Sequence, residues 1–203
     1  MNEDFVRRTV ERASGFVAYD IGANHGTYTG LLAKRFSAVY AFEPHEANLV
    51  HLRKNCEGLD NVTIVPKAIS NISGTGLLYV SESNGGGHSI SKKVAARHNW
   101  GHSLDRHIEI EHITIDDFSM GNSFIPQFIK MDIEGGEDIV WDGAVKTLQD
   151  AKPDIILEVH QCVDLKHLFS LFTGYGYNWY DHENKRCSEL HKDEHYFLTV
   201  KPF

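Results

Sequence analysis

The sequence predicts an α/β protein built on a doubly wound, mostly parallel sheet. Segments typical of strands alternate with segments typical of helices along most of the 203 residues, a pattern that places parallel strands between two layers of helices. Three strand segments are almost continuously apolar, as strands buried on both faces are: Phe16–Ile21, Phe128–Asp132 and Ile155–Val159. The last two strand segments follow a glycine-containing turn and predict an antiparallel C-terminal edge: Tyr177–Tyr180 and Tyr196–Val200.

The remaining elements complete the alternation. Helical spacing of apolar residues predicts helices at Asp4–Ala13, Thr27–Phe36, His45–Cys56, Gly136–Asp150 and Leu165–Phe172, and further strands are expected at Ala38–Phe42 and Val62–Val65. Residues 69–127 form a long irregular stretch with strand-like pieces only at Gly76–Ser81 and Ile108–Ile115. We therefore expect a single domain over residues 1–203, with residues 69–127 inserted as a substrate lid.

Composition limits the classes of function. The net charge of -8 argues against general binding of nucleic acid or of an anionic membrane. Neither an apolar signal region nor a stretch approaching 18 apolar residues is present, so we expect a soluble protein. Cys56, Cys162 and Cys187 are isolated and odd in number, which favours the reducing cytoplasm over a disulfide framework.

The first strand ends in a turn suited to a ligand, Asp20-Ile21-Gly22-Ala23-Asn24-His25-Gly26. Gly22 and Gly26 permit backbone conformations that a side chain would block, and Asn24 tolerates the left-handed region. The dinucleotide fingerprint requires Gly-x-Gly-x-x-Gly, but Asn24 and Thr27 occupy its second and third glycine positions. A nicotinamide-dependent oxidoreductase is therefore the less favoured function.

Two acidic residues indicate the kind of cofactor. Asp20 places a carboxylate at the end of the first strand. There it would repel pyrophosphate and attract the ammonium and sulfonium of S-adenosylmethionine. The attraction between the carboxylate and one of these cationic groups is about 4 kcal/mol before desolvation. Glu43, followed by Pro44, ends the second strand 23 residues after Asp20. That spacing matches an acidic group that binds ribose hydroxyls.

Three blocks then resemble one family: DIGANHGTYT at Asp20–Thr29, FEP at Phe42–Pro44 and KMDIEGGE at Lys130–Glu137. In order and spacing they are similar to the FkbM-type methyltransferases, over roughly residues 16–160. The resemblance implies a Rossmann-like fold with a seven-stranded sheet, S-adenosylmethionine as methyl donor, and O-methylation of sugar or natural-product hydroxyls. The residues expected to bind the cofactor are Asp20, Gly22, Asn24, Gly26, Thr27, Glu43, Pro44 and Asp132.

The catalytic candidates follow two strands that should be neighbours. Asp132 and Glu134 come at the end of Phe128–Asp132, and His160 follows Ile155–Val159. His160 is expected to act as general base because its ordinary pKa lies near neutrality, with Glu158 orienting it. Lys130 and Glu137 are expected to have structural roles, in an internal ion pair and at a helix N-terminus.

Candidate acceptor-binding residues lie in the long insertion. His88 follows three glycines, and Lys92 begins a locally basic stretch that would attract an anionic acceptor. The histidines at 98, 102, 107 and 112 fit no standard zinc spacing. No metal is expected, and Mg²⁺ at Asp132, Glu134 and His160 is the alternative.

The sequence thus favours an O-methyltransferase acting on a small molecule or glycan. A catalytically silent protein that only binds S-adenosylmethionine is the second interpretation, and the oxidoreductase is the third. Neither nucleic acid nor a membrane is an expected partner, and the oligomeric state is left open.

Overall fold

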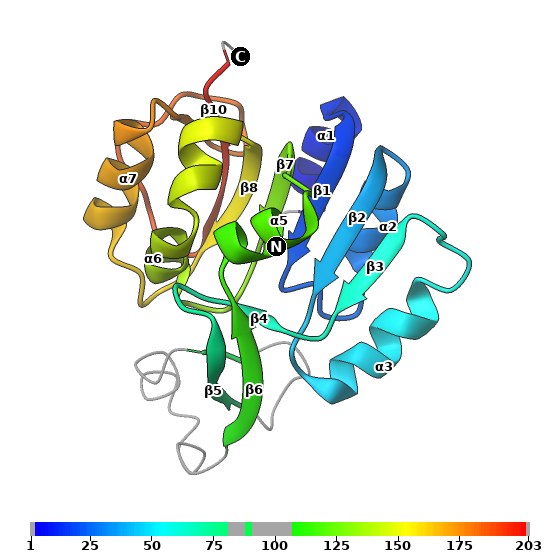
Figure 1. Cartoon of the computed structure of the whole chain (residues 1–203). Coiled ribbons are helices and arrows are strands. Elements are labelled where there is room, and N and C mark those ends of the chain that lie inside the picture. The colour runs from blue at the N-terminus through cyan, green and yellow to red at the C-terminus, as the bar shows by residue number, and fades with distance from the viewer. Residues whose placement is uncertain (1–2, 81–87, 91–106, 202–203) are drawn as a thin grey trace.

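The computed structural model describes residues 3–80, 88–90 and 107–201, and these residues form a seven-stranded sheet with helices on both faces (Figure 1). The strand order is β3-β2-β1-β7-β8-β10-β9. The strands are β1 Gly15–Ile21, β2 Phe36–Phe42, β3 Val62–Val65, β7 Phe128–Met131, β8 Asp154–Val159, β9 Asn178–Tyr180 and β10 Glu194–Thr199. Strands β3, β2, β1, β7 and β8 are parallel, and β10 pairs antiparallel with β8 and β9. The predicted doubly wound sheet with an antiparallel C-terminal edge is confirmed.

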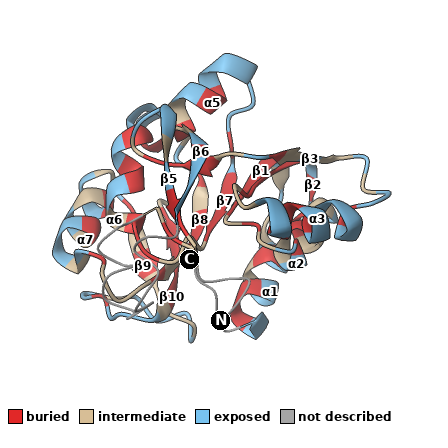
Figure 2. Cartoon of the chain, turned by 90° about the horizontal axis from the view of Figure 1, so that it is seen from below, coloured by how far each residue is buried: buried red, intermediate tan, exposed pale blue. Residues whose placement is uncertain are grey.

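Alternating side chains along β1 and β2 explain why helices cover both faces. Ala18 and Val39 pack with apolar residues of α1 (Glu3–Arg12) and α2 (Thr27–Ala33), while α3 (Glu46–Asn55) covers the adjoining Ala41. Tyr19 and Phe42 point to the other face, toward α5 (Ile115–Asn122), α6 (Glu137–Val140) and α7 (Leu165–Gly174). Figure 2 shows the buried residues concentrated in the strands and on the inner sides of the helices. Within the described ranges, no helix is long and apolar enough to cross a membrane.

A second, three-stranded sheet lies in the predicted insertion. Its order is β4-β6-β5, from β4 Ala68–Ile69, β5 Gly74–Tyr79 and β6 His107–Ile113. The strand-like pieces of the sequence correspond to β5 and β6 with earlier bounds, whereas β4 and α5 were not predicted. The start of α5 does carry a signal, because the Thr114 side chain accepts a hydrogen bond from the Asp117 N–H at 2.9 Å.

The prediction of one continuous helix at Gly136–Asp150 is wrong. The segment consists of α6, a 3₁₀ turn at Trp141–Gly143 and a π-helical turn at Thr147–Ala151. Gly143 lies so close to the second sheet that a Cβ there would be 2.9 Å from both the Ser70 carbonyl oxygen and the Thr114 Cβ. Asp116 also accepts the N–H groups of Lys146 and Thr147, each at 2.9 Å. Tertiary contacts therefore interrupt the helical pattern.

The predicted helix Thr27–Phe36 is also too long. Helix α2 ends at Ala33, and Phe36 already begins β2. Its ring lies 5.4 Å from that of Phe128, in the layer beneath α1 and α2. Phe36 is therefore a buried residue of the sheet, whereas its apolar side chain suggested the apolar face of a helix.

Strand β1 marks the point where the winding direction reverses. The chain runs from β1 outward to β2 and β3, and later returns to place β7 and β8 on the other side of β1. Ile21 at the end of β1 lies opposite Phe42 on one side and Met131 on the other. Ligands of open α/β sheets bind at this switch point, beyond the carboxyl ends of the strands.

Candidate active site

The turn after β1 lies directly against the end of β7. Gly22 has a φ of 74°, and a Cβ at this position would lie 1.8 Å from the carbonyl oxygen of Asp132. Asn24 adopts the left-handed conformation predicted for it, with a φ of 50°. The N–H groups of Gly22 and Ala23 donate to the Phe42 carbonyl oxygen at 3.1 and 2.9 Å. The turn is therefore held by β2 on one side and seated on β7 on the other.

Glu43 connects this turn with the end of β2. Its Oε2 accepts the Asn24 N–H at 2.9 Å, while Oε1 accepts the His45 N–H at 2.9 Å and the Asn48 Nδ2 at 3.3 Å. The residue is buried, and burial raises the pKa of its carboxyl against the lowering effect of these three donors. A carboxylate offers about four acceptor positions, so one acceptor position on Oε2 is left for a ligand.

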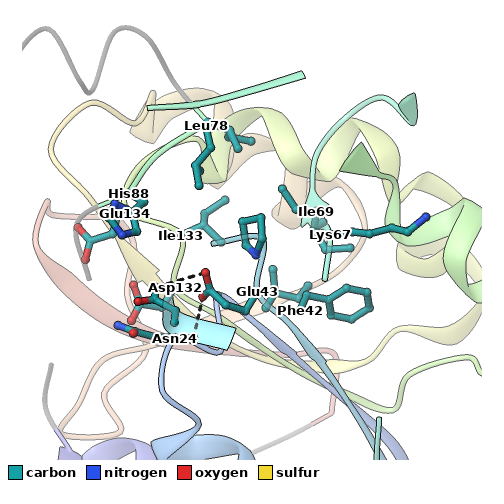
Figure 3. A pocket seen from close by; sticks show the side chains of 16 residues that line it. Asn24, Phe42, Glu43, Lys67, Ile69, Leu78, His88, Asp132, Ile133 and Glu134 are labelled. Carbon is teal, nitrogen blue, oxygen red and sulfur yellow. Dashed lines mark hydrogen bonds between the residues drawn. The ribbon is translucent and has the colours of Figure 1, made fainter. Parts of the chain in front are cut away.

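A cavity opens above these strand ends, beneath the second sheet (Figure 3). Seven predicted site residues line it: Gly22, Asn24, Glu43, Pro44, His88, Asp132 and Glu134. The other lining residues were not predicted: Ile21, Phe42, Asn48, Lys67, Ala68, Ile69, Leu78, Ile90 and Ile133. The sequence did contain one signal for Lys67–Ile69. These residues follow the third parallel strand, and ligands bind beyond the carboxyl ends of such strands.

Asp20 lies outside the cavity lining and is fully buried. Its Oδ2 accepts the Thr29 hydroxyl at 2.6 Å, and its Oδ1 lies 3.4 Å from Lys130 Nζ. Lys130 in turn donates to the Gly22 carbonyl oxygen at 3.1 Å. Burial opposes the charge on Lys130, but Asp20 and Asp132 outweigh it and raise the pKa. Lys130 thus forms its expected internal ion pair with Asp20. The Asp20 carboxylate, which was expected to attract the cofactor directly, faces Lys130 instead.

Two more residues of the predicted cofactor turn do not reach the cavity. Gly26, with a φ of 87°, precedes α2 in contact with α3, where a Cβ would lie 2.7 Å from Leu52. Thr27 is exposed at the first position of α2 and lines a separate depression with Arg7 and Lys34. Gly26 shapes the turn, and Thr27 lies away from the ligand cavity.

The three catalytic candidates do come together. His160 Nε2 lies 3.8 Å from Asp132 Oδ1 and 3.6 Å from Glu134 Oε2, because β7 and β8 are paired neighbours. A third carboxylate oxygen, Oε1 of Glu158, lies 3.7 Å from the same nitrogen. On the other side of the ring, Nδ1 lies 2.5 Å from Oε1 of Glu137, which is fully buried. Four carboxylates therefore surround one imidazole.

This surrounding charge changes the protonation of His160. Burial alone would lower its pKa, but the hydrogen bond with Glu137 and the charges of Asp132 and Glu134 raise it to about 10. At neutral pH the ring then carries a proton on both nitrogens. This shift favours the doubly protonated ring over one with a free Nε2 lone pair, and the general-base role of His160 stays a prediction.

Glu158 is itself fixed from the neighbouring strand. His195 lies opposite Glu158 in the β8–β10 pairing, and its Nε2 is 3.0 Å from Glu158 Oε2. Although burial raises the pKa of Glu158, the hydrogen bond and charge of His195 lower it to about 2. His195 was missed in the sequence because it sits within an apolar strand, and only the pairing register reveals its partner.

His88 lines the cavity, as expected of an acceptor-binding residue, and its ring lies 4.0 Å from that of His45. It is carried there by Ser89, which pairs with Tyr79 of β5 and donates its hydroxyl to the Gly135 carbonyl oxygen at 3.0 Å. Burial and the neighbouring His45 lower the pKa of His88 to about 4. Lys92 and the basic stretch behind it lie outside the described residues.

The lowered pKa of His88 predicts acid sensitivity. A histidine that stays neutral in the folded protein while the unfolded chain binds protons contributes stability above pH 6.5, and this contribution is lost as the pH falls toward about 4. The melting temperature should therefore drop more steeply below pH 6.5 in the wild type than in His88→Gln. Identical pH profiles for the two proteins, measured by circular dichroism, would contradict this assignment.

Comparison with known proteins agrees with the fold. Methyltransferase FkbM from Methylobacillus flagellatus KT has a TM-score of 0.58 at 20% identity, covering 92% of this chain and 43% of that one. A putative tRNA (m1A22) methyltransferase, Sp1610 from Streptococcus pneumoniae, in complex with S-adenosyl-L-methionine, has a TM-score of 0.54 at 12% identity, covering 98% and 71%. A precorrin-6y C5,15-methyltransferase from Geobacter metallireducens GS-15 has a TM-score of 0.51 at 16% identity, covering 96% and 83%.

No curated protein matches the chain. The chain spans less than half of the Methylobacillus protein, so that similarity concerns the shared fold. The model of the methyltransferase FkbM domain, however, matches residues 20–178, which include the turn after β1, Glu43 and the cluster around His160. The chain therefore belongs to the FkbM methyltransferase family, with S-adenosylmethionine as its cofactor.

Proposed function

We propose that the protein transfers the methyl group of S-adenosylmethionine to a hydroxyl of a small molecule or sugar. The observation that carries this proposal is the change in polarity along the cavity. Phe42 and Ile69 lie toward one end, and Asp132 and Glu134 lie toward the other (Figure 3). S-adenosylmethionine has a similar asymmetry, with an aromatic base at one end and, at the other, a sulfonium, an ammonium and a carboxylate with a net charge of about +1.

The lining supports one orientation of the donor. The adenine would pack among Phe42, Ala68, Ile69 and Leu78, and the ribose hydroxyls would donate to the remaining acceptor position of Glu43. Gly22 and Asn24 would then contact the methionine portion, with Asp132 near its positive charges. Asp20 acts on this portion indirectly, by holding Lys130 against the Gly22 carbonyl oxygen.

In the proposed reaction, the acceptor oxygen attacks the methyl carbon as the carbon–sulfur bond breaks. The sulfonium becomes the neutral thioether of S-adenosylhomocysteine, and the hydroxyl proton passes to a carboxylate oxygen of Asp132 or Glu134, beside His160. Alignment of oxygen, carbon and sulfur supplies much of the acceleration in such a displacement. Proton removal as the bond forms contributes about 10²–10⁴-fold more.

The acceptor would approach from the side of the second sheet. His88 and Ile90, which follow β5, border the cavity, and this supports the proposal that residues 69–127 contribute acceptor recognition. A small molecule or glycan suits a concave site of this kind, with apolar walls and a few convergent polar groups. The free cysteines Cys56, Cys162 and Cys187 support the proposed location in a reducing cytoplasm.

The proposal predicts a large effect of His160→Ala on turnover. We expect kcat to fall by about 10²–10³-fold, because the carboxylates of the reaction face lose the group that orders them, while affinity for S-adenosylhomocysteine stays within about threefold. The measurement is mass spectrometry of products formed with a trideuteromethyl donor and a library of glycans and hydroxylated metabolites. His182→Asn, at a half-buried histidine 3.8 Å from Glu194, is the matched control and should retain wild-type activity.

The outcomes also separate the competing functions. Label transfer to oxygen supports the O-methyltransferase, whereas transfer only to nitrogen overturns the choice of hydroxyl acceptors. Donor binding without label transfer to any acceptor supports the silent-binding interpretation. If His160→Ala retains more than about a third of the wild-type kcat, His160 has no role in the reaction.

A further inference from the structure

Three side chains near the ends of β7 and β8 share one arrangement: Asp132, Glu158 and His160. Pairing of opposite charges does not by itself require this arrangement. In each, one polar atom is directed to a neighbour outside the cluster and the other faces the cluster centre. The outward contacts are His160 Nδ1 to Glu137 Oε1 at 2.5 Å, Glu158 Oε2 to His195 Nε2 at 3.0 Å, and Asp132 Oδ2 to Lys130 Nζ at 3.8 Å.

The inward atoms converge at ion-pair distances, which are longer than those of hydrogen bonds. His160 Nε2 lies 3.8 Å from Asp132 Oδ1 and 3.7 Å from Glu158 Oε1, and all three atoms lie within 4.8 Å of one another. These separations exceed those of hydrogen bonds, which end at about 3.2 Å. Ligands placed about 2.1 Å from a divalent cation in octahedral geometry lie about 3.0 Å apart when adjacent and about 4.2 Å apart when opposite. Small movements would bring the three atoms to such positions.

The burial of the outer neighbours adds to this indication. Glu137, Lys130 and His195 are exposed by only 0%, 3% and 6%, and they come from α6, β7 and β10. Histidines that bind metals usually donate their other ring N–H to a carboxylate, which fixes the ring and the tautomer. Glu137 is placed to do this for His160 at Nδ1, and a bound cation would displace the proton from Nε2.

We propose that Asp132, Glu158 and His160 form a binding site for a divalent first-row cation. One imidazole and two carboxylates combine the ligands preferred by Zn²⁺ and Fe²⁺ with those preferred by Mn²⁺ and Mg²⁺. Glu134 Oε2, 3.6 Å from His160 Nε2, is available as a further oxygen ligand. The site departs from the sequence-based expectation of no metal, and it includes Glu158, which the Mg²⁺ alternative did not.

The role of this cation rests on the proposed function. Asp132 and Glu134 also line the donor cavity, so the cation would lie at the end where the acceptor hydroxyl must meet the methyl group. A bound cation polarises a hydroxyl oxygen and lowers the pKa of its proton, while its open coordination positions orient the acceptor. The same centre would then position the nucleophile and ease its deprotonation.

Titration of the metal-free full chain with Mn²⁺, followed by electron paramagnetic resonance, tests the site without any acceptor. We expect one saturable Mn²⁺ per chain, competed by Mg²⁺ or Zn²⁺. His160→Asn and Glu158→Gln should each weaken binding at least tenfold, and Glu137→Gln should weaken it by about 10–100-fold through the ring it orients. His182→Asn, at a half-buried histidine–carboxylate pair of similar separation outside the cluster, should leave binding unchanged.

Circular dichroism melts identify any variant that fails to fold, and the folded variants then decide the outcome. No saturable Mn²⁺ binding, or equal binding in wild type, His160→Asn and Glu158→Gln, overturns the metal site. Calorimetry with S-adenosylhomocysteine in the presence of a chelator tests the proposed function separately. Donor binding without Mn²⁺ binding rejects only the metal site, whereas Mn²⁺ binding without donor binding rejects only the proposed function.

Discussion

Replacing Gly22 with alanine is expected to abolish binding of S-adenosylhomocysteine and to lower the free energy of unfolding by about 3–5 kcal/mol. Two effects combine at this residue. The φ of 74° costs an L-residue about 1–2 kcal/mol. In addition, the new Cβ would lie 1.8 Å from the Asp132 carbonyl oxygen, so the turn and the end of β7 must move apart. That movement opens the cavity at the methionine end.

Gly30→Ala is the matched control for this prediction. Gly30 lies within α2, and a Cβ there would have no heavy atom within 4 Å. Alanine should therefore stabilise the protein by about 0.5–1 kcal/mol, the usual gain over glycine in a helix. Urea unfolding and calorimetry on both variants provide the comparison. A Gly22→Ala protein with wild-type stability and donor affinity would contradict the described packing of the turn.

Replacing Glu43 with alanine is expected to weaken binding of S-adenosylhomocysteine by about 1.5–3 kcal/mol, the range for a hydrogen bond to a charged group. The ribose hydroxyls lose their acceptor, and the N–H groups of Asn24 and His45 lose theirs. Glu43→Gln should also weaken binding, because an amide accepts through one oxygen only and its NH₂ would face one of these two N–H groups.

Glu46→Ala is the control for the Glu43 variants. Glu46 lies three residues further along, and its carboxylate pairs with Arg53 on the exposed side of α3 at 2.8 Å. Exposed pairs of this kind contribute about 0–1 kcal/mol, so donor affinity should not change. Isothermal titration calorimetry measures the donor affinity of both variants. Equal affinity in wild type and a folded Glu43→Ala protein would remove Glu43 from the donor site.

The sequence was most informative where one residue type satisfies a local requirement. Gly22 and Asn24 adopt positive φ values, as their residue types suggested, and Glu43 ends β2 beside the turn. The neighbouring positions of Asp132 and His160 also followed from the sequence, because they come after two buried parallel strands. Strand alternation and turn chemistry are local, and a single sequence reveals them.

Tertiary contacts explain what the sequence did not reveal. Asp20 accepts the Thr29 hydroxyl, forms an ion pair with Lys130 and does not line the cavity, which the sign of its charge alone did not show. The pKa of His160 depends on the carboxylates of Glu137, Asp132 and Glu134, and on burial. The role of His195 depends on the register of β10 against β8. Pairing register and packing bring these groups together, and no local pattern encodes them.

The most direct test of the account is a calorimetric titration of the wild-type chain with S-adenosylhomocysteine and, separately, with NADH. The acidic end of the cavity, the broken dinucleotide fingerprint and the acceptor position left on Glu43 all favour the methyl-donor product. We expect one saturable S-adenosylhomocysteine site per chain, competed by S-adenosylmethionine, and no binding of NADH. Saturable binding of NADH without binding of S-adenosylhomocysteine would contradict the account.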